Sequence, residues 1–234
     1  MSRILKAYES RFRWLLQQVR ARRLDQGVAR LVERARRTSA SEGISLADAL
    51  TRLYEWVSSK PPFRPAPRDT AGLRFFCDAG LGGLARWLRA AGYEARWVAG
   101  IDDDVLLREA AKNSETVLTT DSMLMERRVV RDRIVPALWL PPTMEIPSQL
   151  KLVFRELDLR ILAPRCMSCG GPLRTADKEA LRERIPPKTY RWLDEYFVCS
   201  RCGKLFWHGT HWSRIAKTLA ELETEPQQNQ GAAK

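Results

Sequence analysis

The chain has 234 residues, of which 44% are hydrophobic, and it carries a net charge of +12. A chain of this length can bury one sizeable core with smaller appendages. No apolar run approaches the roughly 20 residues that span a bilayer, and the first residues lack the apolar stretch of a signal peptide. These features predict a cytoplasmic protein without a membrane partner. They do not indicate an oligomeric state.

The charge is unevenly distributed along the chain. Residues 1–70 carry a net charge of +8, residues 71–163 carry none, and residues 164–234 carry +4. Basic flanks around a segment that holds many of the acids suit a polyanion such as RNA, because the flanks would hold it against the centre. A basic surface that serves only solubility is the alternative.

The N-terminal part of the chain has a helical pattern. Apolar residues recur at helical spacing across residues 3–58, and arginines occupy many of the positions between them. We expect a basic region of two or three helices over residues 1–59. Residues 60–72 contain four prolines and no periodicity, which is typical of an extended linker.

The segment that follows alternates between strand and helix patterns. Strands are expected over residues 73–77, 94–98, 116–119 and 134–140, and helices over residues 81–91, 103–112, 122–130 and 147–157. Strict alternation with short connections predicts an α/β fold in which helices flank a parallel sheet. The domain is expected to cover residues 73–163.

Acidic residues stand at the ends of these predicted strands. Asp78 and Asp121 each follow a short apolar strand directly, and Asp103 lies at the start of the helix between them. Because a parallel sheet binds ligands at the carboxyl ends of its strands, the acids can share one cleft. Clustered carboxylates require a cation, and oxygen ligands suit Mg²⁺ or Mn²⁺. Helix capping is the structural alternative for each aspartate.

Several motifs of the chain resemble a known nuclease family. They read F-x-D-x-x-L-G-x-L-A-R-W-L-R-x-x-G-Y, then D-x-x-L-L, L-T-x-D, R-C-x-x-C-x-x-P-L, C-x-x-C-G and W-x-G-x-H. In this order they resemble the Mut-seven C-terminal ribonuclease domain, a branch of the PIN-like nucleases, over roughly residues 73–212. The resemblance implies a PIN-like fold, a metal-dependent RNase activity and an appended zinc ribbon. It implies metal-binding roles for Asp78, Asp103 and Asp121, and it selects RNA over DNA.

The chain departs from the family pattern at two positions. No acid follows Asp121 closely, so the number of catalytic metal ions stays open. Glu115 stands where the family pattern has an arginine. Asp102 and Asp104 flank Asp103 closely enough to take its place as a ligand.

Two arginines lie on the predicted helix after Asp78. Arg86 and Arg89 are three residues apart and therefore share a helix face. Either guanidinium could bind the scissile phosphate or pair with the carboxylates. A structural salt bridge is the alternative for both.

Four of the five cysteines form two C-x-x-C pairs, which are Cys166, Cys169, Cys199 and Cys202. In a chain without a secretory signal, this pattern predicts a zinc site, and four thiolates leave no open position, so the Zn²⁺ would be structural. We expect the ribbon over residues 164–212, with a helix near 176–184. A closing helix at 213–223 and a disordered tail at 224–234 should follow. The ribbon's aromatic residues either pack on the metal knuckles or stack on unpaired bases.

The sequence thus predicts a metal-dependent endoribonuclease that hydrolyses RNA phosphodiester bonds. Its RNA could be tRNA, rRNA or part of the ribosome. The first alternative is a non-catalytic RNA- or ribosome-binding protein on the same scaffold. The second is a phosphotransfer α/β domain with an aspartate after its first strand, but the segment Cys77-Asp78-Ala79-Gly80 has neither the acidic pair nor the D-x-D of such domains.

Overall fold

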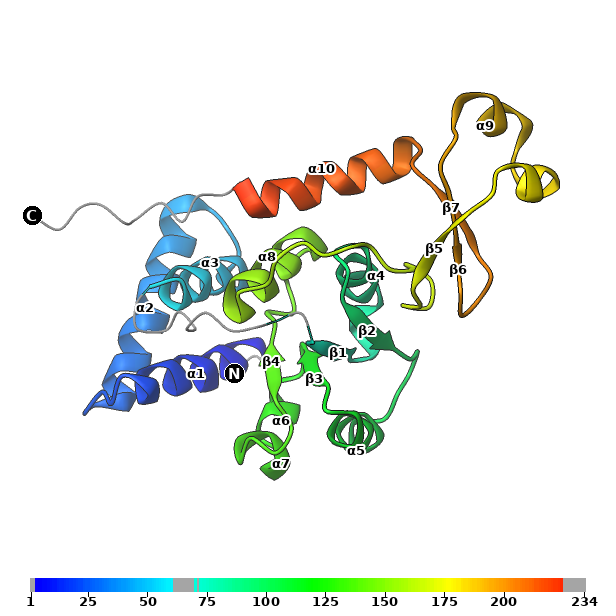
Figure 1. Ribbon diagram of the computed structural model, residues 1–234. Helices are drawn as coiled ribbons and strands as arrows, with labels where there is room; N and C mark the ends of the chain where they lie inside the picture. The colour runs from blue at the N-terminus through cyan, green and yellow to red at the C-terminus, as the bar shows by residue number, and fades with distance from the viewer. Residues whose placement is uncertain (1–2, 61–69, 71, 225–234) are drawn as a thin grey trace, which may run out of the picture.

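The computed structural model describes residues 3–60, 70 and 72–224, and Figure 1 shows their arrangement. Most of the predicted linker and nearly all of the predicted tail lie outside these residues. None of the described helices is long and apolar enough to cross a membrane.

Three helices form the N-terminal region, as the periodicity predicts: α1 (Arg3–Gln18), α2 (Leu24–Glu42) and α3 (Leu46–Ser58). Helix α2 ends at Gly43, whose φ of 65° suits glycine. Ser45 caps α3, because its hydroxyl accepts a hydrogen bond from the Asp48 amide at 3.1 Å. Every third or fourth residue of these helices is apolar, and those side chains meet in a common core.

Four parallel strands form the central sheet: β1 (Arg74–Cys77), β2 (Glu94–Trp97), β3 (Thr116–Thr119) and β4 (Ala137–Trp139). Their order is β2-β1-β3-β4, so β1 and β3 are the central pair. All four predicted strands are confirmed. The last one is shorter than expected and begins at Ala137, after a turn at Arg133, whose φ is 60°.

Helices cover both faces of this sheet: η1 (Ala79–Leu81), α4 (Gly82–Ala90), α5 (Asp103–Asn113), α6 (Ser122–Met125), α7 (Arg128–Arg131) and α8 (Ile146–Leu157). Successive strand residues point to opposite faces. Phe75 therefore packs in the core beneath α4 and α8, while Phe76 packs with Leu106 of α5. The mixed α/β fold class is confirmed.

The single helix predicted over residues 122–130 is wrong, because the chain forms α6 and α7 with a break between them. Arg127 adopts extended backbone angles at the break. Leu124 and Val130 both pack in the α5 core. On one continuous helix, residues six apart would point about 120° away from each other. The break allows both side chains to reach the same core.

The N-terminal helices pack against β4, at one edge of the sheet. Trp139 of β4 is completely buried, and its ring meets Tyr8 of α1 and Tyr54 of α3 edge-on, with centroids 5.3 and 5.5 Å apart. Such pairs add to the hydrophobic gain of burial. The helical region thereby packs on the side chain of an edge strand. It shares one hydrophobic core with the sheet domain.

The C-terminal part forms a second, antiparallel sheet in the order β5-β6-β7, and a returning helix. Its elements are β5 (Leu173–Ala176), η2 (Glu179–Arg184), α9 (Pro187–Trp192), β6 (Tyr196–Cys199), β7 (Leu205–Trp207) and α10 (Thr210–Thr224). The predicted helix at 176–184 is a shorter 3₁₀ helix, and α9 was not expected. Helix α10 begins before the predicted residue 213 and runs back to the sheet domain, where Ile215 and Leu219 are buried (Figure 1).

Candidate active site and metal centre

Asp78 lies at the carboxyl end of the central strand β1 and is buried. Its Oδ2 accepts hydrogen bonds from the Thr119 hydroxyl at 2.5 Å and the Thr120 amide at 3.0 Å. Its Oδ1 accepts one from the Gly80 amide at 3.0 Å. The carboxylate is therefore held in one orientation by groups from the end of β3 and from η1, the turn after β1.

Asp121 stands at the end of the neighbouring strand β3 and is exposed. Its Oδ1 accepts a hydrogen bond from the Met123 amide at 2.7 Å and so caps α6. Its own amide donates to the Thr119 hydroxyl oxygen at 2.9 Å. Thr119 thus connects the Asp78 carboxylate to the backbone of Asp121. The L-T-x-D motif contains this threonine, but the motif alone does not reveal its role.

Asp103 is the first residue of α5 and is partly buried. Its pKa is raised above the ordinary value, first by burial and then by the negative charges of Asp121, Asp102 and Asp78. This electrostatic coupling indicates that the three predicted acids share one region at the carboxyl edge of the sheet. A divalent cation would relieve their mutual repulsion.

The neighbours of Asp103 are already engaged in other contacts. Asp102 caps α5 by accepting hydrogen bonds from the amides of Asp104 and Val105 at 2.9 and 3.3 Å. Asp104 forms an ion pair with Arg127 at 2.6 Å. Among the described residues, no hydrogen bond or ion pair engages the Asp103 carboxylate. This arrangement favours Asp103 as the metal ligand of the three.

The three acids form an open group, because they are not drawn together as tightly as the cysteine ligands described below. Within the described part of the chain, the four-cysteine group is the one whose potential ligand atoms all lie within 4.8 Å of one another. Magnesium sites commonly use one or two carboxylates and complete their shell with water and substrate phosphate. The oxygen donors of Asp78, Asp103 and Asp121 fit such a site.

The two arginines of α4 have different surroundings. Arg89 is buried, and its Nε donates to the Ala95 carbonyl at 2.7 Å, while its Nη1 donates to the carbonyls of Met167 and Ser168 at 3.0 and 2.9 Å. It connects α4 to β2 and to the first cysteine pair, which favours a structural role, through backbone carbonyls and not through the salt bridge considered from the sequence. Arg86 is exposed, and its guanidinium forms no hydrogen bond or ion pair with a described residue.

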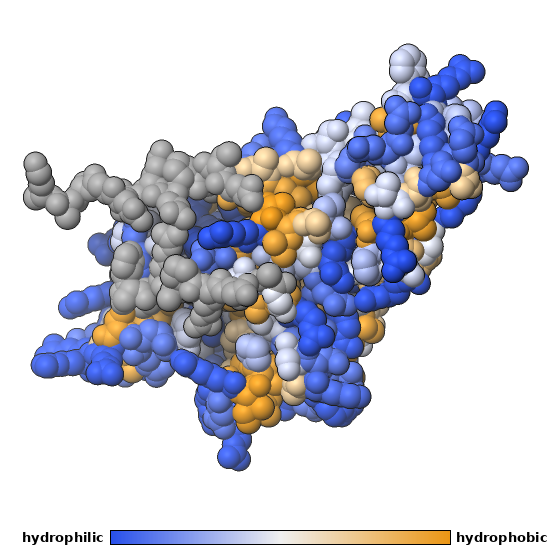
Figure 2. Space-filling model, in the orientation of Figure 1, coloured by the Kyte–Doolittle hydropathy of each residue, from blue (hydrophilic) through white to orange (hydrophobic). Residues whose placement is uncertain are grey.

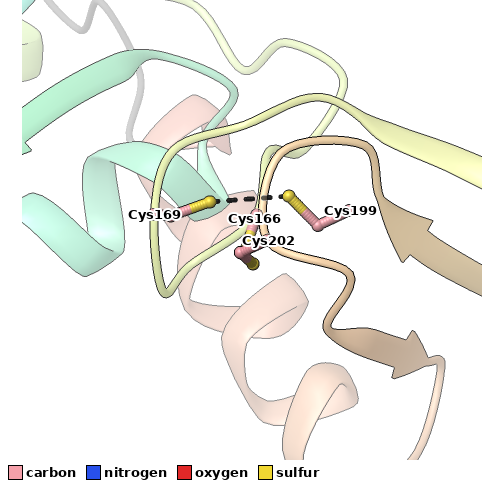
Figure 3. Close-up of side chains that lie close together, drawn as sticks. All are labelled: Cys166, Cys169, Cys199 and Cys202. Carbon is pink, nitrogen blue, oxygen red and sulfur yellow. Dashed lines mark hydrogen bonds between the residues drawn. The ribbon is translucent and has the colours of Figure 1, made fainter.

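The four predicted cysteines come together at the base of the ribbon. Figure 3 shows their side chains pointing toward one another, with Cys169 and Cys199 sulfurs 3.5 Å apart. The sulfurs of Cys166 and Cys202 lie 3.7 Å apart. None of these cysteines forms a disulfide. Four thiols at this spacing can bind a metal ion such as zinc.

The backbone around each cysteine pair is shaped to surround a metal. Gly170 and Gly203 directly follow the second cysteine of each pair and have φ angles of 75° and 69°, which suit glycine. The amides of Gly171 and Arg201 each donate to a cysteine sulfur at 3.4 Å. A Cβ at Gly171 would lie 2.8 Å from the Cys199 sulfur, so this position has no room for a side chain.

Further contacts hold the ribbon against the sheet domain. Glu94 of β2 pairs with Arg201 at 3.0 Å and with Arg165 at 3.7 Å. The backbone amide of Arg165 donates to the Arg89 carbonyl at 2.9 Å. No local pattern marks Glu94, because both of its partners lie far along the chain, in the ribbon. Both sides of the cysteine cluster are thereby attached to α4 and β2.

The Mut7-C RNase domain family matches residues 73–219. The match covers more than half of the chain and includes both the parallel sheet and the cysteine cluster. The chain belongs to the Mut7-C RNase domain family. A curated relative of this member is the exonuclease mut-7 homolog of Homo sapiens, which is 22% identical over 239 residues. The similarity covers 69% of this chain but only 27% of the human protein, and no solved structure matches the chain.

This member of the Mut7-C family uses Glu115 to position a basic residue. Glu115 is buried, and its carboxylate accepts a hydrogen bond from Arg96 of β2 at 2.8 Å. Arg96 also stacks on the ring of Phe76, with its guanidinium 3.9 Å from the ring centroid. Burial raises the pKa of the Glu115 carboxyl, and the Arg96 charge opposes that change. The contacts are internal, so this position serves packing here.

Replacing Arg89 with lysine is expected to destabilise the junction between the ribbon and the sheet domain. Lysine keeps the charge but cannot reach three carbonyls from one planar group. A buried carbonyl left without a donor costs about 1–3 kcal/mol, and of the three acceptors the Ala95 carbonyl has the buried bond. We expect a lower melting temperature and faster proteolysis within residues 164–209. An Arg86→Lys variant is the matched control, and equal stability of the two variants would contradict the structural role of Arg89.

Proposed function

We propose that the chain is a metal-dependent endoribonuclease that hydrolyses RNA phosphodiester bonds. The observation that carries the proposal is the grouping of Asp78, Asp103 and Asp121 at the carboxyl edge of the two central strands, in a member of an RNase domain family. We propose that these carboxylates hold Mg²⁺ or Mn²⁺. The bound cation would activate a water molecule and neutralise charge on the phosphate.

The residues around this group have separate tasks in the proposed reaction. The Thr119 hydroxyl orients the Asp78 carboxylate and holds the backbone amide of Asp121. Asp103 supplies a carboxylate that has no competing partner among the described residues. Arg86, exposed on α4, can contact the non-bridging oxygens of the scissile phosphate. For Arg89, the contacts with three carbonyls support a role in attaching the ribbon instead of binding phosphate.

We propose that the cysteine cluster binds one Zn²⁺ with a structural role. Four thiolates fill a tetrahedral shell, so no position stays open for a reacting water. The net charge of +12 supports RNA as the partner, and structured RNAs such as tRNA, rRNA or the ribosome are candidate substrates. A cytoplasmic location is part of this proposal.

The proposal is tested by incubating the purified protein with labelled linear and circular RNAs. We expect cleavage with Mn²⁺ or Mg²⁺, no cleavage when EDTA is in excess, and recovery when Mg²⁺ exceeds EDTA. An endonuclease opens the circular RNA, whereas an exonuclease, as the human relative is named, cuts only the linear one. Binding without cleavage under any metal would favour the non-catalytic RNA-binding alternative.

A further inference from the structure

A groove of about 920 Å³ lies between the sheet domain and the ribbon. One wall comes from α4 and the end of β2, with Gly82, Arg86 and Trp97. The facing wall comes from the ribbon strands and the start of α10. Figure 2 shows apolar side chains gathered around the base of the ribbon, beside hydrophilic ones. The groove therefore combines apolar and polar surface at the junction of the two parts.

The ribbon wall presents aromatic side chains that the ribbon does not need for its own core. Strand alternation places Tyr196 and Trp207 on the face that packs on the ribbon's buried cluster. Phe197 and Phe206 are cross-strand partners on the opposite face, and both line the groove. They are only partly buried and belong to no described core cluster. The sequence left packing and stacking open for these aromatics. Phe197 and Phe206 belong to the groove alone, whereas Trp207 packs on the cluster and also lines the groove.

A row of rings continues this wall toward α10. Phe197 contacts His208 with centroids 5.0 Å apart, and His208 stacks on Trp212 with centroids 5.5 Å apart and planes 17° from parallel. All three rings line the groove. Their mutual contacts fix the ring planes, so a flat ligand group can stack on them at little cost in side-chain entropy. Trp192, by contrast, is 82% exposed on α9 and lies outside the groove.

The charge of the groove favours an anion. None of the described lining residues is acidic, and besides two histidines the groove has four arginine and lysine residues, which are Arg86, Arg89, Arg165 and Lys204. Arg89 and Arg165 are held by the junction contacts described above. Arg86 is not paired with a described residue, and Lys204 is exposed and donates only to the Ser168 hydroxyl, at 2.9 Å. These two cations stand on opposite walls and can reach phosphates between them.

The groove begins beside the proposed active site. Gly82 and Trp97 line it, and Trp97 pairs in the sheet with Cys77, the residue before Asp78. The Trp97 indole donates to the Ala79 carbonyl at 2.9 Å, which attaches the groove wall to the turn that follows Asp78. A nucleic acid strand bound at Asp78 would therefore enter the groove on that side.

We propose that this groove binds a single-stranded segment of RNA adjacent to the cleaved phosphodiester bond. Unpaired bases stack on the wall of Phe197 and Phe206, and Arg86 and Lys204 hold the phosphates. The proposal rests on the proposed nuclease function and adds its substrate class, unpaired RNA, to it. Base stacking requires exposed rings as well as charge, whereas a surface that bound only phosphates would not require the rings.

The test measures binding of a labelled unstructured oligoribonucleotide by fluorescence anisotropy, in an Asp121→Asn background that leaves the RNA uncut. Adding Phe197→Ala and Phe206→Ala is expected to weaken binding at least about tenfold, since stacking on one aromatic residue contributes about 1–3 kcal/mol. Adding Trp192→Ala instead removes an exposed ring of the same ribbon and should change binding less than about twofold. Unchanged metal content and circular dichroism would show that the ribbon stays folded.

Two further RNA ligands distinguish base stacking from charge, and cleavage by the unmutated protein tests the nuclease proposal separately. An abasic oligomer and an RNA duplex of equal length should bind at least about tenfold more weakly than the unpaired RNA, because neither offers free base faces. Equal binding of the abasic oligomer, or an equal effect of Trp192→Ala, would overturn the groove proposal. If the Phe197→Ala and Phe206→Ala substitutions weaken RNA binding but the unmutated protein cleaves no RNA, the groove proposal is supported and the nuclease proposal is rejected. If the unmutated protein cleaves RNA but these two substitutions leave RNA binding unchanged, the nuclease proposal is supported and the groove proposal is rejected.

Discussion

Replacing Asp121 with asparagine is expected to abolish metal-dependent RNA cleavage while the protein stays folded. The exposed carboxylate of Asp121 caps α6 through the Met123 amide, and asparagine is as good a helix cap as aspartate. The substitution therefore removes the negative charge with little effect on stability. Losing one charged ligand of a catalytic metal costs several kcal/mol of transition-state stabilisation, so cleavage should fall at least about a hundredfold. Single-turnover rates with saturating Mn²⁺, together with thermal melting, measure both effects.

The Asp78→Asn variant provides an informative contrast. Both Asp78 oxygens accept hydrogen bonds inside the sheet, from the Thr119 hydroxyl and from the Thr120 and Gly80 amides. An asparagine amide would place its own N–H groups against one set of these donors, which leaves buried groups unpaired at a cost of about 1–3 kcal/mol. This variant should lose both activity and stability. Full cleavage by the Asp121→Asn variant would exclude that residue as a metal ligand.

Loss of the metal from the cysteine cluster is expected to unfold the ribbon and detach it from the sheet domain. In zinc-finger peptides, structural zinc contributes about 10–16 kcal/mol of apparent binding free energy, and that energy is coupled to folding. A Cys199→Ser variant should retain no bound zinc, whereas the unmutated chain should bind one ion. The carbonyls of Met167 and Ser168, which now accept from Arg89, would lose their fixed positions. Elemental analysis and limited proteolysis of the ribbon measure the outcome.

Cys77 offers the control for this experiment. It is completely buried within β1, away from the cluster, and burial raises the pKa of its thiol, so it behaves as a small apolar residue. A Cys77→Ala variant should keep the metal and the protease resistance of the ribbon. If the Cys199→Ser variant kept a resistant ribbon without zinc, the metal would not be needed for folding.

The sequence alone determines the features of this protein that depend on short-range patterns. The β/α alternation from Leu73 onward reports local periodicity and identifies the parallel sheet, and residues that directly follow strands must lie at its carboxyl edge. This reasoning places Asp78 and Asp121 beyond the carboxyl ends of two strands, and the structure adds that these strands, β1 and β3, are direct neighbours. The C-x-x-C pairs likewise report a local turn geometry, and their sulfurs converge as predicted.

Only the tertiary structure decides the features that depend on contacts between distant segments. Arg86 and Arg89 are equivalent in sequence, but the first cysteine pair, nearly 80 residues later, buries Arg89 and leaves Arg86 exposed. The break at Arg127 similarly follows from the shape of a core to which α5 contributes. The groove between α4 and the ribbon exists because Glu94 and Arg89 hold the two parts together. Burial and long-range pairing are properties of the packed chain, and no local pattern encodes them.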